Sequence, residues 1–232
     1  MSNKLAYTTD SFVVKPLFFR GGNIGKLAVC GTINDLAAAG AIPLFLSAGF
    51  IIEEGFSIEK LHLIAKSMSD VCKHTDAKIV TGDTKVVERG SADGLFINTS
   101  GIGMVSEFYT PRQAEPGDEI IITGGIAEHG TSVILDRYEL GIETELESDC
   151  APMCFLINGL GENLKHVKLM KDPTRGGIAT ALNEIAAEQV LDVELNEQSI
   201  PAKSEVQAIS DILGIDPLYL ACEGRMLIVV EK

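Results

Sequence analysis

The sequence has few basic residues, and this shortage excludes several classes of protein. Its 232 residues include 19 Lys and Arg against 33 Asp and Glu, which gives a formal net charge of -14. Proteins that bind nucleic acid or anionic membranes electrostatically carry the opposite excess. We therefore expect no nucleic acid and no membrane as a partner. An anionic ligand would need a metal ion or local hydrogen-bond donors to offset this charge.

Long hydrophobic runs and paired cysteines are also lacking. The best apolar run, residues 41–52, contains Pro43 and is shorter than the about 20 residues that a membrane helix needs. The first residues have no apolar core of the kind found in signal peptides. The five cysteines are an odd number at scattered positions, which favours reduced thiols over a disulfide framework. These absences predict a soluble cytoplasmic protein.

Segments with strand and helix patterns alternate in two groups, and 46% hydrophobic residues are ample for a core. The first group predicts helices at 25–39 and from Ile58, with Ser57 as N-cap, and strands at 5–8, 12–14, 44–52, 79–81 and 95–104. The second predicts helices at 178–189 and 204–213 and strands at 119–123 and 226–230. Residues 109–117 between the groups hold two prolines. The predicted fold class is therefore α/β (α+β) with two domains, 1–112 and 113–232.

Familiar catalytic motifs are absent, and three aspartates are the first candidates for chemistry instead. Without Walker A, GxSxG or HExxH, the P-loop and common hydrolase classes lose their usual support. Asp10 and Asp83 stand where predicted strands end. Asp35 lies beside Asn34 in a stretch of small and apolar residues. Buried carboxylates need a partner or a metal, and Mg²⁺ takes oxygen ligands of this kind. In so acidic a chain, turn and surface positions explain the same residues, so both interpretations stay open.

Lys85 and Glu223 are candidates for acid–base work. Lys85 follows Asp83 by two residues, so on an extended segment both side chains take the same face. A lysine there could contact a phosphate or act as a base, and it could equally be a solvated strand residue. Glu223 precedes the last predicted strand, where it could be a general base or a turn carboxylate.

The segment Asp172-Pro-Thr-Arg-Gly-Gly177 opens a predicted helix. Gly176 and Gly177 let the backbone approach a ligand, and first-turn N–H groups and Arg175 suit an anion such as phosphate. A simple helix entry capped by Asp172 or Thr174 explains the same residues equally well.

Several motifs together resemble one family over nearly the whole chain. They are Thr8-Thr-Asp-Ser-Phe-Val-Val14 with Pro16-Leu-Phe-Phe19, Gly21-Gly-Asn-Ile-Gly-Lys-Leu-Ala-Val-Cys-Gly31 with Asn34-Asp-Leu-Ala37, Thr81-Gly-Asp-Thr-Lys-Val-Val87, Ile97-Asn-Thr99, Asp172-Pro-Thr-Arg-Gly-Gly177 and Glu223-Gly224. The chain thereby resembles the HypE family of hydrogenase-maturation carbamoyl dehydratases. That family belongs to the aminoimidazole-ribotide synthetase (PurM-like) superfamily.

The resemblance implies a fold and a site. It implies two α/β domains, dimerisation through the sheet of the first domain, and ATP and Mg²⁺ between the domains. By their place in the motifs, Asp10, Asp35 and Asp83 correspond to metal ligands, and Lys85 and Glu223 to a catalytic pair that deprotonates the substrate. The implied nucleotide-binding residues are these three aspartates with Asn34, Thr84, Asp172, Arg175, Gly176 and Gly177.

The resemblance also implies a reaction and partners. The carbamoyltransferase HypF places a carbamoyl group on a C-terminal cysteine, and ATP-dependent dehydration converts this thiocarboxamide to a thiocyanate. The cyanide then passes to the HypC–HypD complex for the iron of NiFe hydrogenase.

Departures from the family pattern keep other interpretations open. A glycine-rich segment before Lys4 and a C-terminal Pro-Arg-Ile-Cys tail are absent, and Cys222 lies in a turn where it cannot replace the tail cysteine. We therefore expect a truncated core that does not complete the reaction in cis. Alternatives are a selenophosphate or aminoimidazole-ribotide synthetase, although Cys30 lacks the context of a selenium-handling cysteine, and a non-catalytic docking module.

Overall fold

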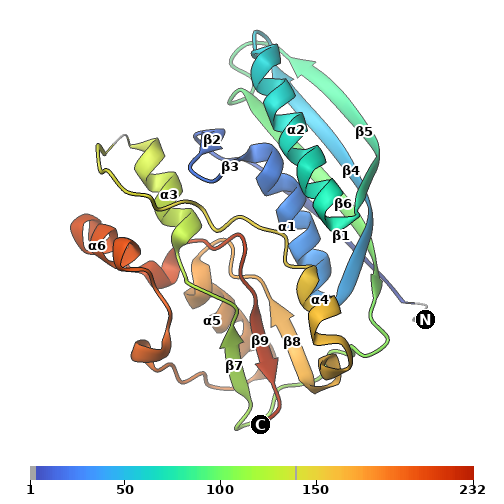
Figure 1. Ribbon diagram of the computed structural model, residues 1–232, viewed down its shortest axis with the longest axis vertical. Coiled ribbons are helices and arrows are strands. Elements are labelled where there is room, and N and C mark those ends of the chain that lie inside the picture. Colours follow the sequence, from blue (N-terminus) through green and yellow to red (C-terminus); the bar gives the residue numbers. More distant parts are fainter. Residues whose placement is uncertain (1–3, 139) are drawn as a thin grey trace. The chain divides into compact units, whose positions relative to one another are not determined.

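The computed structural model describes residues 4–138 and 140–232, which divide into two compact units (Figure 1). Unit 1 contains residues up to Phe18, 22–107 and 151–159, and unit 2 contains 19–21, 108–150 and 160–232. Two α/β units are what the sequence predicts. Short segments are exchanged between the two halves of the chain, and the predicted domain boundary after residue 112 stays a prediction.

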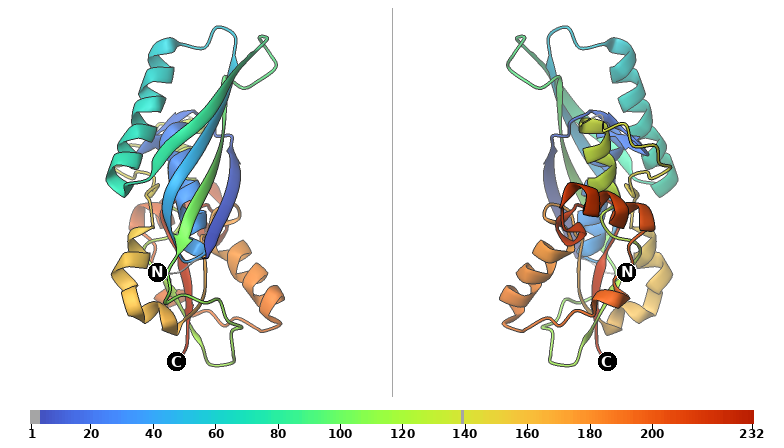
Figure 2. Two further views of the ribbon diagram at one scale, coloured as in Figure 1. Left: turned by 90° about the vertical axis from the view of Figure 1, so that its right-hand side faces the viewer. Right: turned by 90° about the vertical axis from the view of Figure 1, so that its left-hand side faces the viewer.

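Unit 1 is a four-stranded sheet covered on one side by two helices (Figure 2). The strand order is β1 (Leu5–Phe12), β6 (Leu95–Val105), β4 (Ala41–Glu53) and β5 (Lys78–Val87). β6 is antiparallel to both of its neighbours, and β4 and β5 are parallel. The covering helices are α1 (Ile24–Ala38) and α2 (Ile58–Thr75), and smaller elements are β2 (Phe18–Phe19), β3 (Gly22–Asn23) and α4 (Phe155–Leu160). The left-hand view of Figure 2 looks onto the face that these helices leave open.

Helix α1 packs closely against both the sheet and α2 because glycines stand at the points of contact. An added Cβ at Gly25 would lie 2.5 Å from the Ile64 carbonyl oxygen, and one at Gly31 would lie 2.8 Å from the Phe12 ring. Asn23 caps the helix by accepting the N–H groups of its first turn. The small, apolar stretch thus forms the helix predicted at 25–39, and most of its residues are buried.

Two strands extend further than predicted. β1 continues through Asp10, which pairs with Thr99, and β5 continues through Asp83 and Lys85, which pair with residues of β4. The prediction that Asp10 and Asp83 stand at strand ends is therefore wrong. Pairing with a neighbouring strand satisfies the backbone, so these polar residues remain inside the ladder.

Unit 2 contains a three-stranded antiparallel sheet in the order β7 (Glu119–Ile122), β9 (Leu227–Val230) and β8 (Val167–Lys171). Its helices are α3 (Glu128–Arg137), α5 (Gly177–Gln189) and α6 (Ser204–Leu213), with the short helices η1 (Gly161–His166), η2 (Glu197–Ser199) and η3 (Pro217–Tyr219). Apolar residues of α5 and β9 build the core, among them Ile178, Leu182, Leu227 and Val229. β8 and α4 have no counterpart in the sequence prediction, because their short patterns are not distinctive.

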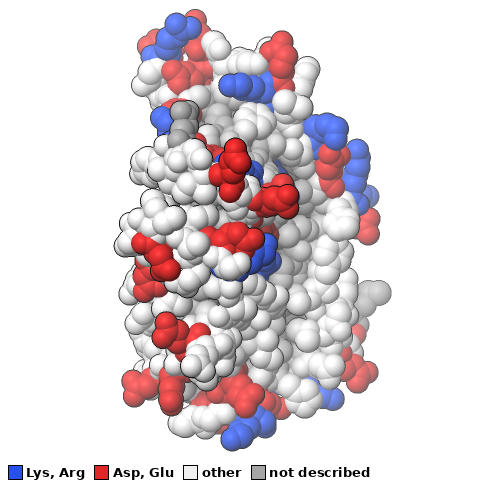
Figure 3. All heavy atoms as spheres, turned by 60° about the vertical axis from the view of Figure 1, so that its left-hand side comes forward, with Lys and Arg blue, Asp and Glu red and all other residues white. Residues whose placement is uncertain are grey.

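The surface agrees in character with the acidic composition. On the face drawn in Figure 3, acidic side chains gather at several places and basic groups are scattered among them. Among the described residues, no helix is long and apolar enough to cross a membrane.

His129 is a buried polar residue in the first turn of α3. Its Nδ1 lies 2.8 Å from the Ser148 hydroxyl oxygen, and the edge of its ring meets Phe19 at 5.2 Å between ring centroids. Burial lowers the pKa of His129 from 6.5 to about 4, so the imidazole is neutral at pH 7.

This burial predicts a loss of stability on acidification. Between pH 6.5 and about 4 the unfolded chain binds a proton that the folded His129 does not bind, so the free energy of unfolding falls as the pH falls. The pKa difference corresponds to about 3 kcal/mol, and His129→Gln should remove this part of the pH dependence. Urea unfolding between pH 4 and 7 measures it. The exposed His62→Gln variant is the control, and an unchanged slope in His129→Gln would contradict the buried, neutral imidazole.

Candidate nucleotide and catalytic site

Asp10 and Asp35 lie on the same side of the sheet, the side of β1 that α1 covers. The Thr8 hydroxyl donates to Asp35 Oδ2 at 2.7 Å, which joins the middle of α1 to β1. Asp10 lies two residues further along β1 and pairs with Thr99, whose buried side chain contacts Thr32 of α1. Because side chains alternate along a strand, Asp10 takes the same face as Thr8 and Asp35.

Asp83 and Lys85 lie on the opposite, open face of the same sheet. In the β4–β5 ladder, Asp83 pairs with Gly49 and Lys85 with Ile51. Gly49 in turn pairs with Asn98, which donates to the Ser11 hydroxyl on the face that the helices leave open. The sequence-based expectation that Asp83 and Lys85 share a face agrees with this register. Both side chains are exposed.

Thr84 takes the other face from its two neighbours. It pairs with Phe50, and both line a groove between β5 and α2 together with Met68 and Cys72. The neighbouring Asp83 also lines this groove, and the assignment of Thr84 to nucleotide binding stays a prediction.

Asn34 is buried in α1, with both ends of its amide engaged by one segment. Its Nδ2 donates to the Ala151 carbonyl at 3.1 Å, and its Oδ1 accepts the Met153 N–H at 2.7 Å. The amide thereby holds the returning segment 151–159 within unit 1. These contacts give Asn34 a structural role, and its assignment to nucleotide binding stays a prediction.

The predicted metal ligands are divided between the two faces of the sheet. Within the described ranges, no group of at least three His, Cys, Asp or Glu residues is placed to hold a metal ion. Asp10 and Asp35 are on the α1 side, and Asp83 is on the open face. One chain therefore does not bring the three carboxylates together, although their oxygen atoms are the ligands that Mg²⁺ prefers.

In unit 2, the two glycines that begin α5 are required by the protein itself. Gly176 and Gly177 both have positive φ, at 79° and 60°. An added Cβ at Gly177 would lie 2.6 Å from the Leu220 carbonyl oxygen, so the loop packs directly on the backbone that follows η3. The sequence analysis expected these glycines to let the backbone approach a ligand. At Gly177 the close approach is instead to the chain's own backbone.

The rest of this loop lies beside Glu223. Gly176 is the N-cap of α5 and has no side-chain cap, so the alternative in which Asp172 or Thr174 caps the helix is wrong. Arg175 is exposed. The Cys222 N–H donates to the Pro173 carbonyl at 3.0 Å, which ties the loop to the segment that carries Glu223. Two predicted site segments of unit 2 therefore meet.

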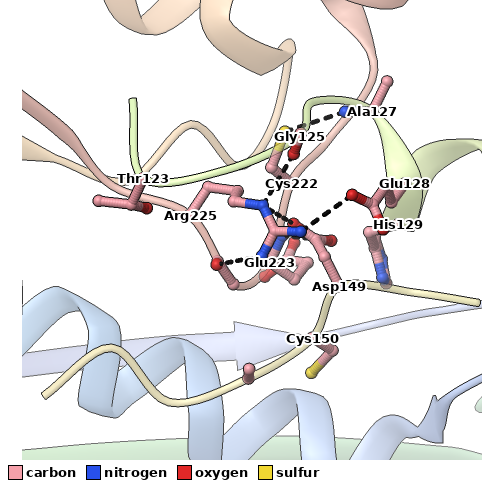
Figure 4. A network of polar contacts seen from close by, with 12 residues as sticks. Thr123, Gly125, Ala127, Glu128, His129, Asp149, Cys150, Cys222, Glu223 and Arg225 are labelled. Carbon is pink, nitrogen blue, oxygen red and sulfur yellow. Dashed lines mark hydrogen bonds and ion pairs between the residues drawn. The ribbon is translucent and has the colours of Figure 1, made fainter. Parts of the chain in front are cut away.

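A buried charge network lies around Arg225, two residues after Glu223 (Figure 4). The Arg225 guanidinium donates to the Gly125 and Gly224 carbonyl oxygens, both at 2.8 Å, and to Glu128 Oε1 at 2.9 Å. The other Glu128 oxygen binds Lys203 at 2.6 Å. Asp149 Oδ2 lies 3.7 Å from Arg225 Nε. The network thereby joins α3, the loop before β9 and two further segments of unit 2.

The sequence analysis missed this network, although one signal was available. An added Cβ at Gly124 would lie 2.7 Å from Arg225 Nε, and one at Gly125 would lie 2.6 Å from Glu128 Oε1. The Gly124-Gly125 pair before α3 therefore makes room for a guanidinium and a carboxylate. A glycine pair followed three residues later by a glutamate could have indicated a packed polar cluster.

Cys222 has the character that the sequence predicts, a thiol held inside a structured loop. Its side chain is fully buried, and its sulfur accepts the Ala127 N–H at 3.2 Å. Burial, followed by the charge of Asp149, raises the pKa of the thiol to about 12. Such a thiol stays protonated and unreactive at neutral pH.

The two halves of the chain match two family models. Residues 1–105 match the AIR synthase related protein N-terminal domain, and residues 115–232 match the corresponding C-terminal domain. The carbamoyl dehydratase HypE of Rhizobium leguminosarum bv. viciae is 50% identical over 230 residues, which are 98% of this chain and 66% of that protein. The chain thus spans about two thirds of the length of this relative.

Solved structures show the same likeness. A crystal structure of a HypE–HypF complex aligns with a TM-score of 0.95 at 50% identity, covering 98% of this chain and 75% of that chain. A crystal structure of hydrogenase maturation protein HypE in complex with ATP aligns with a TM-score of 0.96 at 40% identity, covering 100% of this chain and 70% of that chain. The resemblance seen in the sequence motifs is confirmed, as is the two-domain PurM-like fold. This chain belongs to the HypE family of carbamoyl dehydratases among the AIR synthase related proteins.

Proposed function

We propose that this chain is the core of an ATP-dependent carbamoyl dehydratase of hydrogenase maturation that acts in the cytoplasm. Its substrate is a thiocarboxamide on a cysteine, and its product is a thiocyanate that supplies cyanide for the iron of NiFe hydrogenase. The observation that carries the proposal is the 50% identity to a carbamoyl dehydratase HypE across 98% of the chain. That likeness favours this reaction over those of other PurM-like synthetases and over a docking module.

The chemistry explains why ATP is needed. An amide oxygen is a poor leaving group, and transfer of the γ-phosphoryl group to it makes a good one. The thiocarboxamide oxygen attacks the γ-phosphorus, ADP leaves, and the nitrogen loses one proton. The C–O bond then breaks, phosphate leaves with the oxygen, and loss of the second N–H proton completes the C≡N bond. Mg²⁺, when bound, offsets negative charge on the phosphates.

Different residues of this chain have different roles in that reaction. We assign Asp10, Asp35 and Asp83 to the Mg²⁺–phosphate contacts, and Lys85 and Glu223 to removal of the two nitrogen protons. Arg175 and the start of α5 provide a cation and N–H groups for phosphate oxygens. A relative binds ATP and another forms a complex with HypF, which supports ATP as the cofactor and HypF as a partner here. The HypC–HypD complex is the proposed acceptor.

A second copy of the chain would complete the site. The open face exposes Tyr7, Phe45, Ile51 and Ile102, and nearly every residue of the edge strand β5 is exposed. β1 and β5 are the two edges of the sheet. Joining β5 of each copy to β1 of the other closes two sheets into one ring and removes both free edges. This homodimer would place the β5 segment that carries Asp83 of one copy beside the β1 segment that carries Asp10 of the other.

Substitutions at Asp83 and Lys85 should separate nucleotide binding from the dehydration step. We expect Asp83→Asn to weaken Mg-ATP binding by roughly a hundredfold or more while the fold is kept, because a phosphate-bound metal loses a charged ligand. Lys85→Ala should bind Mg-ATP normally but fail to remove water from an S-carbamoylated Pro-Arg-Ile-Cys peptide. Calorimetry measures binding, and mass spectrometry of the peptide measures dehydration. The exposed Asp70→Asn variant is the control. Normal affinity in Asp83→Asn would remove its metal role, and normal dehydration by Lys85→Ala would make Lys85 structural.

Mixed dimers test whether the site is shared between copies. Asp83→Asn and Asp35→Asn should each lose Mg-ATP binding alone. After the two variants are unfolded and refolded together, about a quarter of the sites should bind again, because half of the dimers are mixed and each mixed dimer holds one intact site. Calorimetric stoichiometry gives the fraction. A mixture that stays without binding would show that Asp83 and Asp35 act within one chain.

A further inference from the structure

The Asp149 carboxylate lies directly behind the backbone of Glu223. Its side chain has no exposed surface, and its Oδ1 accepts the Glu223 N–H at 3.2 Å. The Gly224 N–H lies near the same carboxylate. The backbone of the loop that carries Glu223 is thus held at the Glu223 N–H by one buried side chain, as Figure 4 illustrates for this region.

Arg225 holds Asp149 in turn and fixes the far side of the same loop. Its Nε lies 3.7 Å from Asp149 Oδ2, and its Nη1 donates to the Gly224 carbonyl at 2.8 Å. The loop is therefore held on both sides of Glu223, by Asp149 at the Glu223 N–H and by Arg225 at the Gly224 carbonyl. Glu128 orients the guanidinium from α3 through a hydrogen bond of 2.9 Å. Connected, charge-assisted contacts of this kind make a loop rigid.

Stability alone is a poor explanation for a carboxylate at this place. Burial raises the pKa of Asp149, which means that the ionised form is costly here despite the N–H groups and Arg225. In the described part of the chain its Oδ2 has no hydrogen-bond partner. An apolar residue of similar size would avoid that cost. What the carboxylate supplies, and an apolar side chain does not, is a fixed acceptor, Oδ1, for the Glu223 N–H and a charge that faces Arg225.

We propose that Asp149 is a positioning residue for Glu223: by accepting the Glu223 N–H, and held by Arg225, it sets the backbone from which the Glu223 carboxylate reaches the substrate. This inference rests on the proposed role of Glu223 in deprotonation. Asp149 itself touches no substrate. It acts on the reaction only through the placement of Glu223, so its effect must vanish when Glu223 is removed.

A first experiment needs neither substrate nor ATP. Asp149→Asn keeps the size of the side chain and removes its charge, and Asp118→Asn is the matched control. Asp118 is also largely buried, accepts the Glu115 N–H at 2.7 Å and lies 3.9 Å from the buried Lys168. We expect hydrogen exchange of the amides of 222–225 and native-state alkylation of Cys222 by iodoacetamide to become roughly tenfold faster in Asp149→Asn only. Unchanged exchange and alkylation would overturn the proposal.

A second experiment tests the coupling to chemistry. In the S-carbamoylated peptide assay, Asp149→Asn should lower kcat roughly tenfold with an unchanged KM for ATP, whereas the double variant with Glu223→Gln should be no slower than Glu223→Gln alone. A further loss in the double variant would show that Asp149 acts independently and would overturn positioning. Full activity of Glu223→Gln would instead defeat the proposed role of Glu223, while the exchange result still decides whether Asp149 holds the loop.

A second variant covers the case in which Asp149→Asn fails to fold. Glu128→Gln loosens Arg225 and should therefore speed hydrogen exchange at the amides of 222–225. Unchanged exchange at these amides would overturn the proposal.

Discussion

Strand pairing in unit 1 decides which side chains can act together. β4 pairs with β6 on one side and β5 on the other, and β6 pairs with β1, so from Ser47 onward in β4 the pairing is regular across the sheet. Because side chains alternate along each strand, this register sends Asp10 to the side of α1 and Asp83 to the open face. A slip of one residue would exchange these faces and bury the wrong set of side chains. The division of the acidic residues is therefore a consequence of the same pairing that forms the core.

In unit 2, the buried carboxylates of Glu128 and Asp149 are balanced by Arg225, which is mostly buried, and by Lys203, which is about half exposed. Arg225 and Lys203 face Glu128 and Asp149, so the positive and negative groups are equal in number. Each cation contacts a carboxylate from another segment, and the guanidinium fork also binds two carbonyl oxygens. Removing Arg225 would leave Asp149 buried without a cation, which is more costly than removing both groups. The loop before β9 is consequently shaped by electrostatics as much as by apolar packing.

Local signals in the sequence were sufficient for much of the fold. Ser57 caps α2 by accepting the Lys60 N–H, and α6 has the predicted bounds Ser204–Leu213. Such features depend on neighbouring residues, which the sequence displays directly. The extension of β1 through Asp10 depends instead on pairing with Thr99, far along the chain. Asp149 and Glu223 are 74 residues apart, and nothing near either residue announces their hydrogen bond. Sequence motifs identified the candidate residues, whereas the groups that hold these residues in place became visible only in the fold.

The glycine pair before α3 makes the residues at several positions depend on one another. Gly124 leaves the space that Arg225 fills, and Gly125 leaves the space beside the Glu128 carboxylate. A side chain at Gly124 would displace the guanidinium, which would then release both the Gly224 carbonyl and Glu128. Conversely, without Arg225, Gly124 would add only backbone freedom and would leave a cavity where the guanidinium now lies. A substitution at any of these positions is tolerated only together with compensating substitutions at the others. As the sequence diverges, these positions should therefore change jointly or not at all.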